Sequence, residues 1–183
     1  ASSNFPVVAP LWSTRNGAMD AFYTRFSNSM TAVQFSTFLG GSSGSLLAEE
    51  TGTGVSVDPQ NRVWIVGVTP STNFPNTAGG YQPNFGGGPS DGFIAVFNGN
   101  TNLWSTYLGG SGLDGLTAVT ATANLAAVAG YTTSPDLRVQ APLQSARAGE
   151  YDAMWAVFPP GVSTPLHFSY LGGSASDSAL AVT

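Results

Sequence analysis

The chain has 183 residues, of which 8% are charged and 42% hydrophobic, and its formal net charge is −5. It contains no cysteine, which excludes disulfides, zinc–thiolate sites and iron–sulfur clusters. An acidic chain without a basic stripe is a poor ligand for nucleic acids or anionic membranes, because it cannot displace counterions from phosphates. No apolar run approaches the ~20 residues of a transmembrane helix, so membrane insertion is not expected.

Short apolar segments alternate with clusters of Gly, Pro, Asn and Ser along the chain. This punctuation is typical of β-strands, and no window shows a sustained helical period. In chain order, strands are predicted at 21–26, 33–39, 55–58, 63–69, 93–97, 103–108, 116–122, 125–131, 153–158, 167–171 and 179–183. Tight turns at 59–62, where Asn can take a left-handed conformation, and at 98–101 are predicted to close two hairpins.

Three motifs recur along the chain: Leu-Gly-Gly, an Asp followed by an apolar segment that ends in Phe, and Asn-Phe-Pro. They occur at Leu39, Leu108 and Leu171, at Asp20, Asp91 and Asp152, and at Asn4 and Asn73, respectively. The three Leu residues are 69 and 63 residues apart. A unit of this size cannot bury both faces alone, so such repeats stack on their neighbours.

Each cycle contains a short apolar strand, its hairpin partner, a long loop and a second hairpin. Four antiparallel strands per repeat are the pattern of a β-propeller blade. We therefore predict an all-β fold of propeller-type blades of four antiparallel strands, about three blade-equivalents with a split terminal blade. The single domain 1–183 divides into a half blade (1–39), two full repeats (40–108 and 109–171) and the start of a next blade (172–183).

The small, uncharged strands at 55–58 and 116–122 suit the crowded position near a propeller axis. The strands that end in Leu-Gly-Gly would then lie outermost, and the chain must cross from each of them to the next inner strand. We expect the glycine pairs to supply the positive-φ conformations for this crossing. These glycines are Gly40, Gly41, Gly109, Gly110, Gly172 and Gly173.

Segment 105–114, Ser-Thr-Tyr-Leu-Gly-Gly-Ser-Gly-Leu-Asp, resembles the bacterial β-propeller repeat family called the SBBP repeat. The hairpin at 57–69, Asn73-Phe-Pro and Ser90-Asp-Gly-Phe are similar to other parts of the same pattern. The third cycle departs from it, because 118–131 lacks the Asp and the Gly-Asn turn. The resemblance implies a propeller fold and an extracellular or cell-surface protein, and it implies no particular reaction. The low charge is typical of the same location.

When the repeats are aligned, one blade has strands one, three and four divided between the two ends of the chain. Three blades cannot close a ring, since propellers close with 4–8 blades. Two hypotheses follow: the chain is part of a longer propeller, or several copies complete one another. An open sheet edge invites such pairing, and head-to-tail joining without closure gives a filament.

Candidate catalytic residues are few. Segment 40–44 matches Gly-x-Ser-x-Gly around Ser42, but a hydrolase nucleophile needs a strand–turn–helix context with a His and an acid, so a turn is predicted. His167, the only histidine, is expected to be a surface or edge residue. Glu49 and Glu50 could form an acid pair, but as neighbours in a loop they are expected to be solvated.

Acidic residues recur at two positions of the repeat. The first group is Asp20, Asp91 and Asp152, and the second is Asp114 and Asp177. Repetition favours a structural task, such as accepting backbone N–H groups in a turn. A structural calcium ion at a loop between repeats is the alternative, and it would need several oxygens converging on one point. No other cofactor is expected.

Most aromatic residues fall on predicted strands, where packing between blades is expected. Trp12, Tyr81 and Phe85 lie on loops among Asn, Gln and Gly, where exposed rings could stack on sugars. We predict a non-catalytic structural or interaction module, extracellular or at the cell surface, whose partners are other copies of itself or the remaining blades of a longer chain. A glycan- or polymer-binding module that uses these three rings is the alternative.

Overall fold

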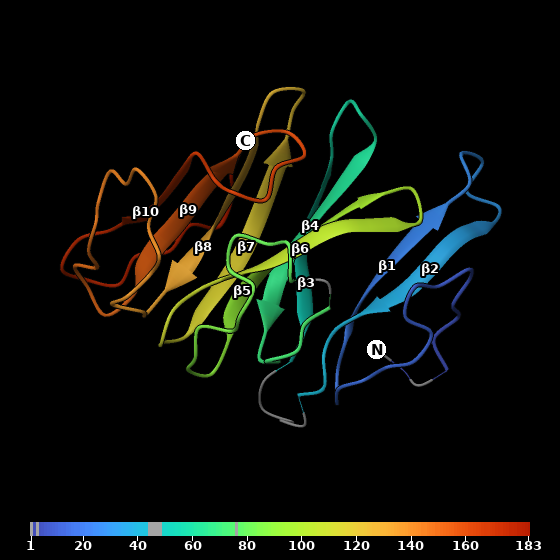
Figure 1. Cartoon of the computed structure of the whole chain (residues 1–183), viewed down its shortest axis with the longest axis horizontal. Coiled ribbons are helices and arrows are strands. Elements are labelled where there is room, and N and C mark those ends of the chain that lie inside the picture. The colour runs from blue at the N-terminus through green and yellow to red at the C-terminus, as the bar shows by residue number, and fades with distance from the viewer. Residues whose placement is uncertain (1, 3, 44–48, 76) are drawn as a thin grey trace.

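The computed structural model describes residues 2, 4–43, 49–75 and 77–183. This part of the chain forms ten antiparallel strands in three sheets. The same residues contain no helix that is long and apolar enough to span a membrane. The three sheets lie side by side, with the N-terminal and C-terminal sheets at opposite ends (Figure 1).

We number the sheets in chain order. Sheet one contains β1 (Ala21–Phe26) and β2 (Val33–Leu39). Sheet two contains β3 (Thr51–Val57), β4 (Arg62–Thr69), β5 (Asp91–Asn98) and β6 (Thr101–Leu108). Sheet three contains β7 (Asp114–Ala121), β8 (Ala126–Thr132), β9 (Asp152–Phe158) and β10 (His167–Leu171).

Sheets two and three are antiparallel meanders in which each strand pairs with the next along the chain. The first strand of each sheet forms one edge, and the strand that ends in Leu-Gly-Gly forms the other. The all-β prediction is therefore confirmed, as is the placing of these two strands at opposite edges. The sheets do not close into a ring, so their assignment as propeller blades stays a prediction.

The hairpin turns show how side chains stabilise the meander. Asn61 is left-handed with φ of 59°, as predicted, and Asp58 Oδ1 accepts the N–H of Arg62 at 2.9 Å. In the third repeat Thr122 takes the same place, and its Oγ1 accepts the N–H of Leu125 at 3.1 Å. The hairpin is therefore retained although the Asp and the Gly-Asn turn are missing.

Two predictions about secondary structure are wrong. The segment 179–183 is not a strand, because among the described residues it meets β7 and β8 only through separate hydrogen bonds and has no ladder partner. Ala179 N–H donates to the Gly130 carbonyl at 3.2 Å, and Thr117 Oγ1 donates to the Ala179 carbonyl at 2.6 Å. The predicted loop at 40–54 is shorter, since β3 begins at Thr51, and 44–48 lie outside the described residues.

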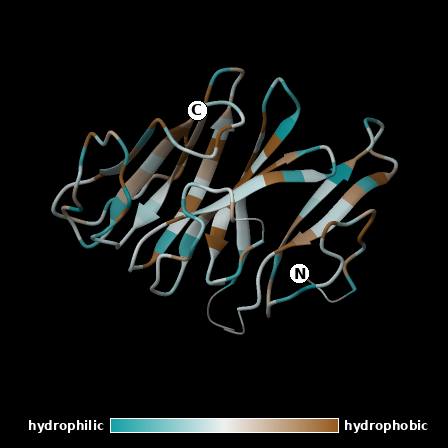
Figure 2. Ribbon diagram, in the orientation of Figure 1, coloured by the Kyte–Doolittle hydropathy of each residue, from teal (hydrophilic) through white to brown (hydrophobic). Residues whose placement is uncertain are grey.

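Two hydrophobic clusters fill the spaces between neighbouring sheets, and apolar residues follow the strands of all three (Figure 2). Successive side chains of a strand point to opposite faces, so β5 sends Phe93 into the cluster shared with sheet one and Ile94 into the cluster shared with sheet three. Sheet two is thus covered by a neighbouring sheet on both faces, whereas within the described residues sheets one and three each have a neighbouring sheet on one face only.

Candidate interface at the sheet junctions

A junction follows each Leu-Gly-Gly, where the chain passes from one sheet to the next. The N–H of the second glycine donates to a carboxylate further along the chain. This carboxylate lies where the first strand of the next repeat begins. The pairs are Gly41 with Glu50 (2.8 Å), Gly110 with Asp114 (2.7 Å) and Gly173 with Asp177 (2.8 Å). Glu50 takes the place of the aspartates and is buried, so the expectation that it is solvated is wrong, whereas Glu49 is exposed.

The other recurring acids hold the loop that precedes the third strand of each repeat. Asp91 Oδ2 accepts the N–H of Gly86 at 2.8 Å and the side-chain amide of Gln82 at 3.1 Å. The same kind of loop hydrogen bond joins Asn16 and Gly17 to Asp20, and Ala148 and Gly149 to Asp152. The carboxylates thus accept hydrogen bonds from backbone donors of loops that are only partly buried and fix the shape of each loop.

The first glycine of each pair lies against these acids. A Cβ atom on Gly109 would come within 2.5 Å of Asp91 Oδ1 and 2.8 Å of Asp114 Oδ2. Gly40 and Gly172 are crowded by the acids of their own junctions in the same way. None of the Leu-Gly-Gly glycines has a positive φ, so the prediction that they supply such conformations is wrong. The first glycine of each pair is needed because no side chain fits beside the carboxylates.

Each of the first two junctions also binds the segment that follows the second strand of the next sheet. Ser42 donates its N–H and Oγ–H to Asn73 Oδ1 at 2.8 and 3.2 Å. Ser111 makes the same two bonds to Asp136 Oδ1, at 2.9 and 3.0 Å. Ser42 is therefore the repeat counterpart of a turn serine, and Gly44, the last residue of the Gly-x-Ser-x-Gly match, lies outside the described residues.

A buried tyrosine completes the contact, and sequence analysis did not single it out for this role. The Tyr107 hydroxyl accepts the N–H of Phe74 at 2.7 Å and donates to the Ser71 carbonyl at 2.8 Å. Tyr170 does the same with Leu137 and Ser134. Only backbone groups of the partner segment are used, which explains why Ser-Pro-Asp-Leu can replace Ser-Thr-Asn-Phe. The recurrence of Tyr before Leu-Gly-Gly was the available signal.

Burial controls the electrostatics of the junctions. It raises the pKa of Asp91 to about 8, against the hydrogen bond from Gly86, and the neighbouring Asp114 carboxylate adds to the rise. Burial likewise raises the pKa of Asp114 and of Glu50. The described residues include no group of three or more His, Asp or Glu arranged to hold a metal ion. Backbone N–H donors surround these carboxylates, so the geometry gives the calcium alternative no support.

The three rings considered for glycan binding do not share a surface. Tyr81 is buried between sheets two and three, its hydroxyl donates to the Arg138 carbonyl at 2.6 Å, and the Arg138 guanidinium lies 4.5 Å from its ring centroid. Trp12 and Phe85 pack against the cluster between sheets one and two. The expectation of exposed rings is wrong for Tyr81, and a glycan-binding role stays a prediction.

His167 is exposed on the edge strand β10, as predicted. Its Nδ1 lies 3.0 Å from the Ala141 carbonyl, and its ring stacks on Trp155 at 6.1 Å between centroids. The contacts described for Ser42 lie at the junction between sheets one and two, whereas His167 belongs to sheet three. The structure therefore does not bring the serine and the histidine together as a catalytic pair.

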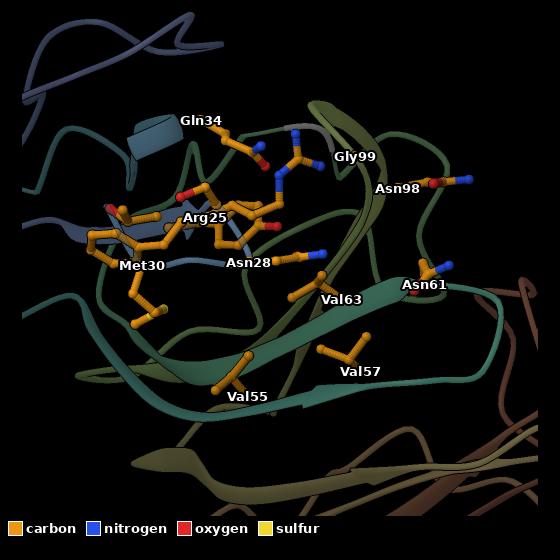
Figure 3. Close-up of a pocket in the computed structure, with 14 residues that line it drawn as sticks. Arg25, Asn28, Met30, Gln34, Val55, Val57, Asn61, Val63, Asn98 and Gly99 are labelled. Carbon is orange, nitrogen blue, oxygen red and sulfur yellow. The ribbon is translucent and has the colours of Figure 1, made fainter. Parts of the chain in front are cut away.

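An open groove of about 780 Å³ lies between β1 and β3. Val55 and Val57 point into it from β3, opposite Met30 from the β1–β2 turn (Figure 3). Their counterparts on β7, Val119 and Ala121, pack against the cluster between sheets two and three. The groove is present because, in the part of the chain that the structure describes, no strand pairs with the second edge of β1.

Comparison with protein-family models gives no match to this sequence, and comparison with curated proteins gives none either. The similarity to the SBBP repeat therefore stays a prediction based on the motifs themselves. The structure defines an all-β protein of repeated sheets joined by acid-anchored Leu-Gly-Gly junctions.

Proposed function

We propose that this chain is a non-catalytic structural and interaction module, extracellular or at the cell surface, built of propeller-type blades. In this proposal copies assemble by completing the blade whose strands are divided between the two ends of the described chain. The junctions determine the arrangement of the repeats, because they make the same contacts from sheet to sheet and so specify how one repeat follows another.

The observation that carries the proposal is the position of the segment after sheet three. The N–H of Asp177 donates to the Tyr151 carbonyl at 2.8 Å. The N–H of Asp114, which starts β7, makes the same bond to Ser90 at 2.9 Å. The start of this segment is therefore held beside sheet three by the same hydrogen bond that holds the start of β7 beside sheet two.

A second pair of hydrogen bonds has the same relation. Thr53 Oγ1, at the bulge of β3, donates to the Leu116 carbonyl of β7 at 2.6 Å. Thr117 Oγ1, at the bulge of β7, donates to the Ala179 carbonyl at 2.6 Å. Segment 177–183 thus lies across β7 in the place of a first strand, and sheet one supplies counterparts of a third and a fourth strand. Together they provide parts of one further sheet.

The contacts of the candidate chemical groups support a structural role. The recurring carboxylates accept hydrogen bonds from backbone N–H groups, and Asp58 Oδ2 forms an ion pair with Arg62 at 2.6 Å and accepts a bond from the Trp64 indole at 3.3 Å. Acids that are held in this way stabilise loops and turns. The same contacts favour the structural proposal over an enzyme with acids in a channel.

Light scattering after size exclusion, combined with negative-stain imaging, tests the proposal on this 183-residue chain. We expect a closed oligomer of defined mass or a filament, with a fraction assembled that increases with concentration. A folded monomer over the whole concentration range would contradict assembly between copies. Thermal unfolding with soluble oligosaccharides tests the glycan alternative, which predicts a rise in Tm that is lost in Trp12→Ala and Phe85→Ala.

A further inference from the structure

Sheet one has an apolar face that no other sheet of the described chain covers. We call it the Phe face and define it by Phe5, Phe22 and Phe26. Phe22 is 51% and Phe26 46% exposed, and Phe5 packs on Phe22 with ring centroids 4.5 Å apart. Their counterparts in sheet two, Phe74, Phe93 and Phe97, are buried against sheet one, and Phe74 stacks on Phe93 at the same 4.5 Å.

Sheet three has an apolar face at the other end of the molecule. We call it the Leu face and define it by Leu143, Trp155, Val157 and Leu171. Leu143 is 81% and Leu171 56% exposed, and the other two are partly buried. Their counterparts in sheet two are Tyr81, Ile94, Val96 and Leu108, all of which are buried in the cluster shared with sheet three.

Both internal interfaces pair a Leu-type face with a Phe-type face. Between sheets one and two, Tyr23 packs on Phe97 with ring centroids 5.0 Å apart. Between sheets two and three, Trp104 packs on Phe158 with ring centroids 6.1 Å apart, and Tyr81 and Phe168 form a T-shaped pair with centroids 6.5 Å apart. Neither exposed face contains a charged residue, so covering them buries apolar area without desolvating an ion.

The junction loops add a polar contact that also runs from one repeat to the next. Ser42 binds Asn73 and Ser111 binds Asp136 across the two internal interfaces. In the repeat alignment their next counterpart is Ser174, beside the Leu face, and the counterpart of Asn73 is Asn4, beside the Phe face. Ser174 and Asn4 are both exposed, so each is accessible to a second molecule.

We infer that the Leu face of one copy packs on the Phe face of a second copy, head to tail, with Ser174 of the first donating to Asn4 of the second. The partner is thus another molecule of this chain, and the contact is heterologous, because it joins two different surfaces. A heterologous contact propagates into a ring or a filament according to its rotation. The inference rests on the proposed function and names the surfaces by which copies assemble.

Complementary blocked variants test this contact. Phe22→Asp with Phe26→Asp blocks the Phe face, and Leu143→Asp with Leu171→Asp blocks the Leu face. All four side chains are at least 46% exposed, so folding is expected to survive, as circular dichroism and thermal unfolding would show. We expect each blocked variant alone to be monomeric, and an equimolar mixture to form a heterodimer of twice the monomer mass through the one intact pair of faces. Leu125→Asp, an exposed turn residue outside both faces, is the matched control and should assemble like the unchanged chain.

The outcomes separate the two proposals. If the unchanged chain assembles and the blocked variants still form large assemblies, the proposed function stands and this contact is wrong. Dimers of one blocked variant alone would indicate a face that pairs with itself and would also overturn the inference. If the unchanged chain is monomeric, both the proposed assembly and this contact are wrong.

A cross-link tests the same contact without disturbing either face. The chain has no cysteine, so Asn4→Cys combined with Ser174→Cys provides the only thiols. Mild oxidation should give a ladder of multimers on a non-reducing gel, and either single substitution should give no product larger than a dimer. The absence of a ladder in a chain that does assemble would overturn the inference.

Discussion

Phe22 and Phe93 occupy the same place in successive repeats, yet Phe22 is 51% exposed and Phe93 is fully buried. Each begins the apolar segment after a recurring aspartate, and each packs against a phenylalanine that precedes proline, at 4.5 Å between ring centroids. The local structure is therefore shared, and the difference comes from the neighbouring sheet. Sheet one covers Phe93, and no sheet of the described chain covers Phe22.

The largest effect expected from this comparison is on folding stability. Phe93→Ala should lower the free energy of unfolding by about 3–5 kcal/mol, because it leaves a cavity in a packed core. Phe22→Ala should cost about 1 kcal/mol, because its ring is already half in water. Chemical denaturation at a dilution where the chain is monomeric measures both. Equal losses in the two variants would mean that other residues of the same chain cover Phe22 in solution.

The junction of sheets two and three is expected to make folding stability depend on pH, because Asp91 and Asp114 are fully buried there. The folded state raises the pKa of Asp91 from its ordinary 3.8 to about 8, so it binds the proton more tightly than the unfolded chain does. This contribution is fully present below about pH 4 and is lost as pH rises toward 8. We therefore expect the free energy of unfolding to decrease as pH rises from about 4 to 8, because the unfolded chain releases this proton more readily than the folded chain does.

Thermal unfolding between pH 4 and 9 measures this decrease. Asp91→Asn keeps an acceptor for Gly86 and removes the titration, so its profile should be flatter. Hydrogen bonds from Arg62 and Trp64, against the effect of burial, lower the pKa of Asp58. Its contribution is lost only as pH falls below about 4, so it leaves the window from pH 4 to 8 unaffected. A profile of the unchanged chain that rises from pH 5 to 8 would contradict the assignment.

The smallest effect distinguishes a crowded junction glycine, Gly109 after β6, from an uncrowded one, Gly173 after β10. Gly109→Ala should destabilise the chain by about 1–3 kcal/mol through overpacking, since its Cβ would come within 2.5 Å of Asp91 Oδ1. Gly173→Ala should be close to neutral, because its Cβ would find Asp177 Oδ2 at 3.9 Å, an ordinary contact. Urea titration of the two variants in parallel gives the difference. Equal values would show that the acids move away from the added methyl group.

Much of the fold could be predicted because its signals are local. Strands, hairpin turns and the order of strands within a sheet depend on residues that are close in sequence, and the left-handed Asn61 is one example. The glycines of the junctions show the limit. Their conservation from repeat to repeat could be recognised, but the cause was assigned to backbone conformation. Only the positions of Asp91 and Asp114 on either side of Gly109 show that the cause is space.

The candidate site divides in the same way. That Asp114 and Asp177 recur at one repeat position is visible in the sequence, whereas Glu50 was not recognised as their counterpart, because its spacing from Leu-Gly-Gly differs. Burial of Tyr81 could not be predicted either, since its environment is made by Arg138 of the loop between β8 and β9 and by Phe168 of sheet three.

The sequence by itself determined that this protein is all-β, that it is built of repeats, and which segments form hairpins, because alternating side chains and turn residues act over a few positions of chain. The tertiary structure alone decided which apolar faces are covered. Burial depends on what lies across from a side chain, and for Phe93 and Phe22 that is a neighbouring sheet in one case and, within the described chain, an open face in the other.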